Sequence, residues 1–162
     1  MKERITEESI KSLQQEGLRF SVDTLAERLR ISKKTIYKYF PAKEDLAYAI
    51  YEKYYGDLNE KIRGIIQSGG ETMTEKLLLC YFDSAKMVRE EIFNKYSLNR
   101  TIGDFARQQH LAVWSAISPC VCGNINGEAE EICKLITDGA FDKAIARNAD
   151  PGKVIEVLRR IK

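Results

Sequence analysis

Apolar residues recur at helical spacing along almost the whole chain, and the pattern is sharpest between positions 21 and 40. There, two short apolar stripes follow each other, one made of Val22, Leu25, Ala26 and Leu29 and the other of Ile36 and Phe40. Spacings of three and four place each stripe on one side of a helix. Ser21 and Ser32 stand before the stripes as N-caps, and Pro41 ends the second pattern. The sequence therefore predicts two short helices whose apolar sides face one core.

Longer patterns predict the remaining elements. We expect helices over residues 3–16, 43–67, 72–89, 101–117, 128–147 and 151–161, a short segment over 91–98, and a loop over 118–127 that holds a proline, two glycines and two asparagines. We find no strand pattern, repeat or low-complexity segment. The predicted fold class is all-α, with a three-helix N-terminal head that contains a helix-turn-helix and is followed by a helical body.

Charge is divided unevenly between head and body. The net charge is only +2, but residues 1–43 hold ten Lys and Arg against six Asp and Glu, whereas residues 44–162 hold sixteen against eighteen. Between Arg28 and Lys43 there are six basic residues and no acidic one. A basic head on a slightly acidic body predicts a nucleic-acid contact in the head and another task for the body.

The second short helix is the predicted recognition helix. The face opposite Ile36 and Phe40 holds Lys34 and Lys38, with Thr35 and Tyr37 at its sides. The alternative for the basic cluster is a solvated run of charge. For Lys43, at the start of the following helix, the alternatives are a phosphate contact or an ordinary exposed helix start beside Glu44 and Asp45.

These residues resemble the DNA-binding domain of the TetR family of bacterial repressors. The resemblance covers about the first 47 residues, and its most specific part is the run Thr-Ile-Tyr-Lys-Tyr-Phe-Pro-Ala-Lys-Glu at positions 35–44; Gly17, Phe20, Leu25, Ala26 and Leu46 also fit. The resemblance implies a helix-turn-helix domain over residues 1–47 and an effector-binding and dimerisation domain over 48–162. One departure is Arg30, which stands where the family usually has a glycine in the turn.

From the residues and the resemblance we predict a DNA-binding surface made of Ser21, Arg28, Ser32, Lys33, Lys34, Thr35, Tyr37, Lys38, Tyr39 and Lys43. The resemblance places Lys33, Lys34, Thr35, Tyr37 and Tyr39 at the family's DNA-contacting positions and Lys43 at its phosphate-contacting lysine. The partners implied are a double-stranded DNA operator and a second copy of the chain.

The resemblance also suggests two sites in the body. The ligand-pocket candidates are Tyr81, Phe93, Tyr96, Phe105, His110 and Trp114. The dimer-interface candidates are Ile132, Ile136, Gly139, Ala140, Ile155 and Leu158, on the last two predicted helices. The alternative for both sets is ordinary core packing, because aromatic and aliphatic stripes at helical spacing usually fill the interior.

Other chemistry is weakly indicated. Cys120 and Cys122, with Cys133 and His110 nearby in sequence, suggest a metal or thiol site, but Cys-x-Cys alone is not the usual spacing of a zinc site. We therefore expect no metal, no cofactor and no enzymatic activity. The longest apolar patch, residues 77–82, is far shorter than the roughly 20 residues that span a bilayer, and the first residues lack a signal-peptide pattern. We expect a cytoplasmic protein without a membrane partner.

The favoured function is a DNA-binding transcriptional regulator, most simply a repressor, that binds a palindromic operator as a homodimer and is released by a small-molecule effector. One alternative is a DNA-docked adaptor whose body recruits a protein and binds no small molecule. Another is a thiol or metal sensor, or a small enzyme, that uses Cys120 and Cys122.

Overall fold

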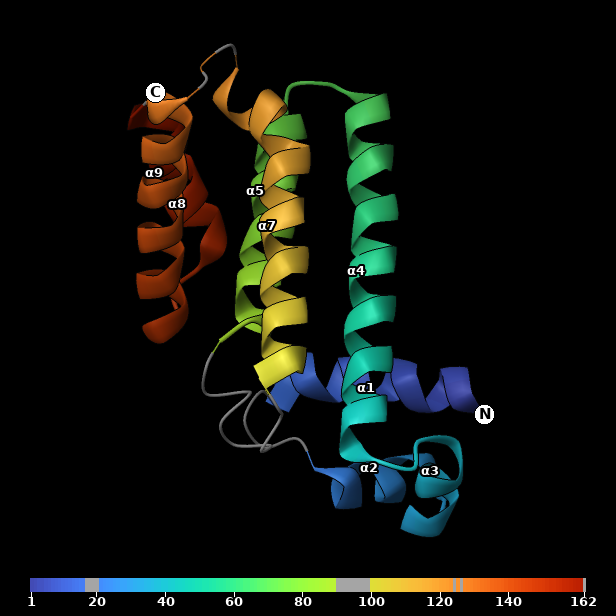
Figure 1. Cartoon of the computed structure of the whole chain (residues 1–162). Coiled ribbons are helices and arrows are strands. Elements are labelled where there is room, and N and C mark those ends of the chain that lie inside the picture. Colours follow the sequence, from blue (N-terminus) through green and yellow to red (C-terminus); the bar gives the residue numbers. More distant parts are fainter. Residues whose placement is uncertain (17–20, 90–99, 124, 126, 162) are drawn as a thin grey trace. The chain divides into compact units, whose positions relative to one another are not determined.

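The computed structural model describes residues 1–16, 21–89, 100–123, 125 and 127–161 (Figure 1). All regular elements in these ranges are helices, and their bounds are α1 Lys2–Glu16, α2 Val22–Leu29, α3 Lys33–Tyr39, α4 Lys43–Ser68, α5 Met73–Met87, α7 Arg100–Cys122, α8 Glu128–Ala146 and α9 Pro151–Ile161. The predicted all-α fold class is confirmed. The segment expected over 91–98 lies outside the described residues.

The chain forms two compact units. Unit 1 is Met1–Asp57 with Met87–Ala106, and unit 2 is Leu58–Lys86 with Arg107–Lys162. The helices α4 and α7 therefore each contribute residues to both units. The boundary expected from the sequence, between residues 47 and 48, falls inside α4 and remains a prediction.

Unit 1 contains the three N-terminal helices. Ile5 of α1, Leu25 and Leu29 of α2, and Ile36 of α3 have exposed fractions of 4% or less, so the two short apolar stripes do share one core. Phe40, directly after α3, closes this core at 2% exposure. The stripes expected from the sequence are therefore the buried sides of α2 and α3.

Hydrogen bonds at both predicted N-caps set the helix starts. The Ser21 hydroxyl accepts from the backbone N–H of Thr24 at 3.1 Å, and the Ser32 hydroxyl accepts from that of Thr35 at 3.1 Å. Between the two helices, Arg30 has φ 54° and ψ 46°, the left-handed conformation at the C-terminal end of α2. The non-glycine residue at the turn thus adopts the backbone that glycine would adopt more easily.

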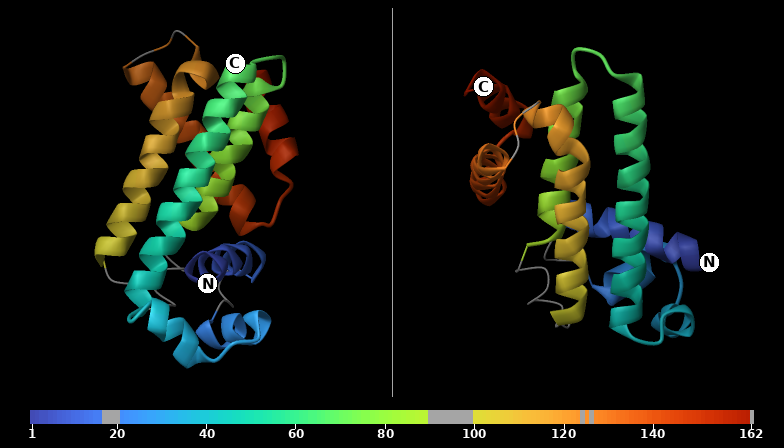
Figure 2. Two further views of the ribbon diagram at one scale, coloured as in Figure 1. Left: turned by 90° about the vertical axis from the view of Figure 1, so that its right-hand side faces the viewer. Right: turned by 45° about the horizontal axis from the view of Figure 1, so that its top comes forward.

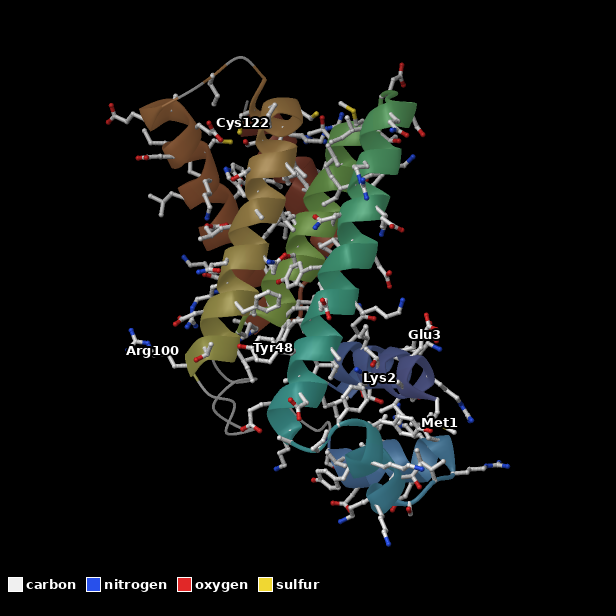
Figure 3. All side chains as sticks on the ribbon, turned by 45° about the vertical axis from the view of Figure 1, so that its right-hand side comes forward. Met1, Lys2, Glu3, Tyr48, Arg100 and Cys122 are labelled. Carbon is white, nitrogen blue, oxygen red and sulfur yellow. The ribbon has the colours of Figure 1, made fainter. Side chains whose placement is uncertain are left out.

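The first part of α4 packs through aromatic residues within unit 1. The Tyr51 hydroxyl donates to the Met87 carbonyl at 2.9 Å, and the Tyr48 ring lies 5.6 Å from the Phe105 ring. Tyr48 is labelled on α4 in Figure 3. At the N-terminus of α4, the Asp45 carboxylate accepts a hydrogen bond from the Ala42 N–H at 2.9 Å, which satisfies one of the donors at the helix start.

Unit 2 is built around three aromatic side chains from three helices. Tyr81 of α5 lies with its ring centre 5.1 Å from Trp114 of α7 and 6.1 Å from Phe141 of α8. The helices α8 and α9 contact each other, and α9 lies next to α8 in the right-hand view of Figure 2. Glu75 of α5 and Arg159 of α9 form an ion pair at 3.5 Å. Packing of α5, α7 and α8 therefore surrounds Tyr81, and α9 is linked to α5 at the surface.

The prediction of a loop over residues 118–127 is wrong for the first half of this range. Residues 118–122 continue α7, and Pro119 lies inside the helix. A proline there costs about 3 kcal/mol, but Ile117 and Val121, four residues apart, are buried at 0% and 4% exposure and favour the helix. The helix ends at Cys122, and the next residue, Gly123, has a φ of +69°, which glycine adopts more easily than other residues. In the described part of the chain, no helix combines the length and apolar character required to cross a bilayer.

Candidate nucleic-acid interface

The solvent-facing side of α3 carries two lysines and two tyrosines. Lys34 and Lys38 are exposed, and the exposed fractions of Tyr37 and Tyr39 are 39% and 38%. Ile36, on the opposite side of the helix, is 1% exposed. Burial of Ile36 therefore fixes the rotation of α3 and directs the cationic side to solvent, as predicted from the spacing.

Five of the predicted DNA-binding residues line one open concavity on this surface: Ser32, Lys34, Thr35, Tyr37 and Lys38. The Ser32 and Thr35 hydroxyls lie 2.9 Å apart and form a hydrogen bond, so the capping hydroxyl also orients the threonine side chain. The concavity thus combines ammonium groups, hydroxyls and an aromatic ring, which are the groups that contact phosphates and base edges.

Lys33, by contrast, is engaged within the head. Its ammonium group forms an ion pair with Asp23 of α2. A hydrogen bond to Asp23 and the negative charge of that carboxylate raise the pKa of Lys33. Asp23 was not predicted as part of the surface, although its place in the first turn of α2, on the helix that precedes the recognition helix, is a usable signal.

Three more predicted residues also have partners inside the head. An Arg28 guanidinium nitrogen donates to the Ser12 hydroxyl at 3.2 Å and lies 3.9 Å from the Glu8 carboxylate. Ser21 and Ser32 serve as the N-caps described above. These contacts explain why such residue types occur at these positions without reference to DNA, and their DNA contacts remain predictions.

Lys43 is exposed as the first residue of α4. Glu44 and Asp45 follow it in the same turn, and Asp45 is occupied in capping the Ala42 N–H. A cation at a helix N-terminus is opposed by the helix dipole, and a bound anion relieves that opposition. This geometry suits a phosphate contact.

The ligand-pocket candidates are not all brought together. Tyr81, His110 and Trp114 cluster in unit 2, whereas Phe105 packs against Tyr48 in unit 1. Phe93 and Tyr96 lie outside the described residues. A ligand site that includes all six therefore stays a prediction.

A polar network surrounds His110. Its ring stacks on Tyr81 with centres 4.5 Å apart, and its Nδ1 lies 2.7 Å from the Ser84 hydroxyl. The Tyr81 hydroxyl donates to Asp138 at 2.7 Å, and Asp138 is paired with Lys134. Burial lowers the pKa of His110 to about 4, with Asp138 acting in the opposite direction and Lys134 in the same one. Sequence reasoning missed Ser84, Lys134 and Asp138, because only the fold brings them near His110.

The dimer-interface candidates divide into two groups. Ile132 and Ile136 of α8 are 50% and 47% exposed, and Gly139 is exposed beside them. Ile155 and Leu158 of α9 are 0% and 9% exposed, so they are covered within the single chain. Two apolar residues of the same helices that are not among the six candidates, Leu135 at 72% and Val157 at 57%, are more exposed than any of the candidates whose exposed fraction is known. Ala140 has intermediate exposure.

The cysteines do not pair as the Cys-x-Cys spacing suggests. The Cys122 sulfur lies 3.1 Å from that of Cys133, and Cys80 is buried. In the ranges that the structure describes, no group of three His, Cys, Asp or Glu side chains is arranged to hold a metal ion.

Comparison with known proteins agrees with this geometry. Residues 5–50 match the family model described as "Bacterial regulatory proteins, tetR family". A Bacillus subtilis (strain 168) protein described as the uncharacterized HTH-type transcriptional regulator YvaF is 23% identical over 128 residues, which cover 74% of this chain and 67% of that protein. A crystal structure of a TetR/AcrR-family transcriptional regulator from Thermobifida fusca YX-ER1 superposes with a TM-score of 0.53 at 19% identity, covering 99% of this chain and 93% of the other. The N-terminal residues 5–50 thus match the TetR family of bacterial regulatory proteins, and the chain shares the fold of the TetR/AcrR-family structure.

Proposed function

We propose that this chain is a cytoplasmic transcriptional repressor. It binds a palindromic DNA operator as a homodimer, and a small-molecule effector releases it from the DNA. The observation that carries the DNA-binding part is the outward face of α3, on which Lys34, Tyr37 and Lys38 are exposed while Ile36 anchors the helix in the core. A helix presented in this way fits the major groove, and its ammonium groups neutralise phosphates or donate to bases.

Two kinds of contact follow from the positions of the side chains. Lys34 and Thr35 are proposed to contact base edges, because lysine donates to guanine O6 and N7 and the threonine methyl group packs on thymine. Tyr37, Tyr39 and Lys43 are proposed to contact phosphates, which orient the helix without reading sequence. Lys33 can contact a base only if its ammonium group leaves the ion pair with Asp23 and binds DNA instead.

The exposed apolar side chains of α8 support the homodimer. Ile132, Leu135 and Ile136 are about half exposed or more, and such a cluster is unfavourable in water unless a partner covers it. A Cβ added at Gly139 would meet no atom of this chain within 4 Å, so the position is open to close approach by a second helix. We propose that this side of α8, with Val157 of α9, forms the contact between copies.

The buried polar network of unit 2 supports an effector site. Burial of polar groups in a core lowers the stability of the fold unless hydrogen bonds compensate for it. The side chains of Tyr81, Ser84 and His110 form such hydrogen bonds at positions where apolar side chains would serve stability alone. We propose that Tyr81, His110 and Trp114 contact the effector. The effector binds the DNA-free form of the protein more tightly than the DNA-bound form, and so it releases the protein from DNA.

Selection of bound fragments from genomic DNA, followed by anisotropy titration of the selected duplex, tests the function. We expect Lys34→Ala to weaken operator binding and alter sequence preference, and Lys43→Ala to weaken binding to all sequences alike. Lys76→Ala, which removes an exposed lysine from α5, is the matched control and should leave binding unchanged. Selection that returns no enriched sequence, or equal affinities for all four proteins, contradicts the proposal.

A further inference from the structure

Two thiols from consecutive helices of unit 2 meet at their sulfur atoms. Cys122 is the last residue of α7, and Cys133 lies near the start of α8. Their sulfurs are 3.1 Å apart, within the range of a thiol hydrogen bond and about 1 Å longer than a disulfide bond. Figure 3 labels Cys122 at the end of α7, where the chain turns toward α8. The two sulfurs therefore have to approach each other by only about 1 Å to reach bonding distance.

We propose that Cys122 and Cys133 are a modification site, at which a hydroperoxide converts the two thiols reversibly into an intramolecular disulfide. This inference is independent of the proposed DNA binding. It also replaces the Cys120 and Cys122 pair suggested by the sequence with a different pair.

The chemistry balances with hydrogen peroxide as the oxidant. One cysteine loses its proton, and its thiolate attacks a peroxide oxygen; the O–O bond breaks, the cysteine becomes a sulfenic acid, and the departing hydroxide takes up that proton to form water. The sulfur of the second cysteine then attacks the sulfenic sulfur, the S–O bond breaks, and water leaves. The two cysteines are oxidised by two electrons in total, and the peroxide is reduced to two molecules of water.

Access distinguishes this pair from Cys80. Cys122 and Cys133 both have intermediate exposure, so a small oxidant reaches them, whereas Cys80 is completely buried. Burial also raises the pKa of the Cys80 thiol, which disfavours the reactive thiolate. Cys120 has the same intermediate exposure as Cys122, and its position two residues earlier in the same helix turns it to a different side.

The position of the pair gives the modification a structural consequence. Cys133 follows the exposed Ile132 directly and precedes the exposed Ile136 by about one helical turn. A covalent bond to Cys122 ties this part of α8 to the end of α7. Oxidation therefore restrains the start of the helix that carries the exposed apolar residues.

Peptide mapping of the peroxide-treated protein tests the inference. Trypsin leaves Cys120, Cys122 and Cys133 in one peptide, residues 108–134, because no Lys or Arg lies between them. A glutamate-specific protease cuts after Glu128, Glu130 or Glu131 and separates Cys133 from the other two. The full-length chain is treated with hydrogen peroxide, blocked with N-ethylmaleimide, digested with both proteases without reductant and analysed by mass spectrometry.

We expect a disulfide-linked peptide pair that contains Cys133 in the unaltered chain and in Cys120→Ser, and loss of this pair in Cys122→Ser and Cys133→Ser. Dithiothreitol should convert the pair back to separate thiol peptides. A Cys133 link that persists in Cys122→Ser, links only between chains, or oxidation to sulfinic and sulfonic acids without a link overturns the inference. Because no DNA is present, these outcomes are separate from any failure of operator binding.

Discussion

Lys33, at the start of α3, is held in an ion pair by Asp23 of α2. The two helices of the helix-turn-helix are thus linked at the surface beside Lys34 and Thr35. The pair has a direct consequence for DNA binding, because Asp23 both occupies Lys33 and adds a negative charge next to the proposed phosphate contacts.

We expect Asp23→Asn to increase DNA affinity. The change removes a carboxylate that repels phosphates and makes the Lys33 ammonium group available to DNA. Anisotropy titration should show tighter binding and a steeper dependence on salt. Asp57→Asn, which removes an exposed carboxylate from α4, is the control. Unchanged or weaker binding by Asp23→Asn would show that the ion pair positions α3 and that Lys33 is not a DNA contact.

Arg30→Gly should stabilise the chain by about 1 kcal/mol, because Arg30 has φ 54° and a residue with a Cβ is disfavoured in this conformation. Urea unfolding measures the change. Arg30→Ala removes the same side chain but keeps the Cβ, so it should give no such gain. If the glycine variant is no more stable than the alanine variant, the turn is not strained.

Acidification should destabilise the chain through His110. The folded chain holds this histidine neutral down to a pKa of about 4, whereas the unfolded chain binds a proton below its ordinary pKa of 6.5. The associated stability is complete above pH 6.5 and is lost as the pH falls toward 4. At 1.36 kcal/mol per pKa unit, the loss between pH 7.5 and 5 is about 2 kcal/mol.

The chain has one histidine, so a single variant isolates this effect. We compare urea unfolding at pH 7.5 and pH 5 for the unaltered chain and for His110→Gln. The variant should lose less stability on acidification, whatever its stability at pH 7.5. Equal losses in the two proteins would mean that His110 takes up its proton equally in the folded and unfolded states.

Ile136→Glu should convert the proposed dimer to a monomer, because it places a charge in the centre of the exposed apolar side of α8. Sedimentation velocity across a range of concentrations measures the change. Ile66→Glu alters an apolar residue of α4 that is 37% exposed, and it should leave the dimer intact. A dimer that survives Ile136→Glu places the contact elsewhere.

The head could be predicted in detail because its determinants are local. Ser21 and Ser32 each cap the helix that follows, and the stripe from Val22 to Leu29 needs only helical spacing to define its buried side. Even the backbone of Arg30 follows from its place at the end of α2. The family resemblance covers the same residues, so residue pattern and resemblance agree where both apply.

The body could be predicted only as a series of helices. Apolar spacing cannot tell an inward stripe from an exposed one, so Ile155 and Ile132 were given the same role although one is buried and the other half exposed. The hydrogen bond between the Tyr81 and Asp138 side chains joins residues that are 57 positions apart, so only tertiary packing brings them together. We expected a loop at Pro119 because proline disfavours a helix. Burial of Ile117 and Val121 favours the helix, and α7 continues through this residue.

The salt dependence of operator binding tests most directly whether α3 and the start of α4 contact DNA. If each subunit neutralises about four phosphates through residues such as Lys34, Lys38 and Lys43, a plot of log affinity against log salt concentration should have a slope near −7 for the dimer. Anisotropy titrations of the selected operator at several salt concentrations give this slope. A slope shallower than about −2 would contradict the account, because it leaves the exposed lysines without phosphates to neutralise.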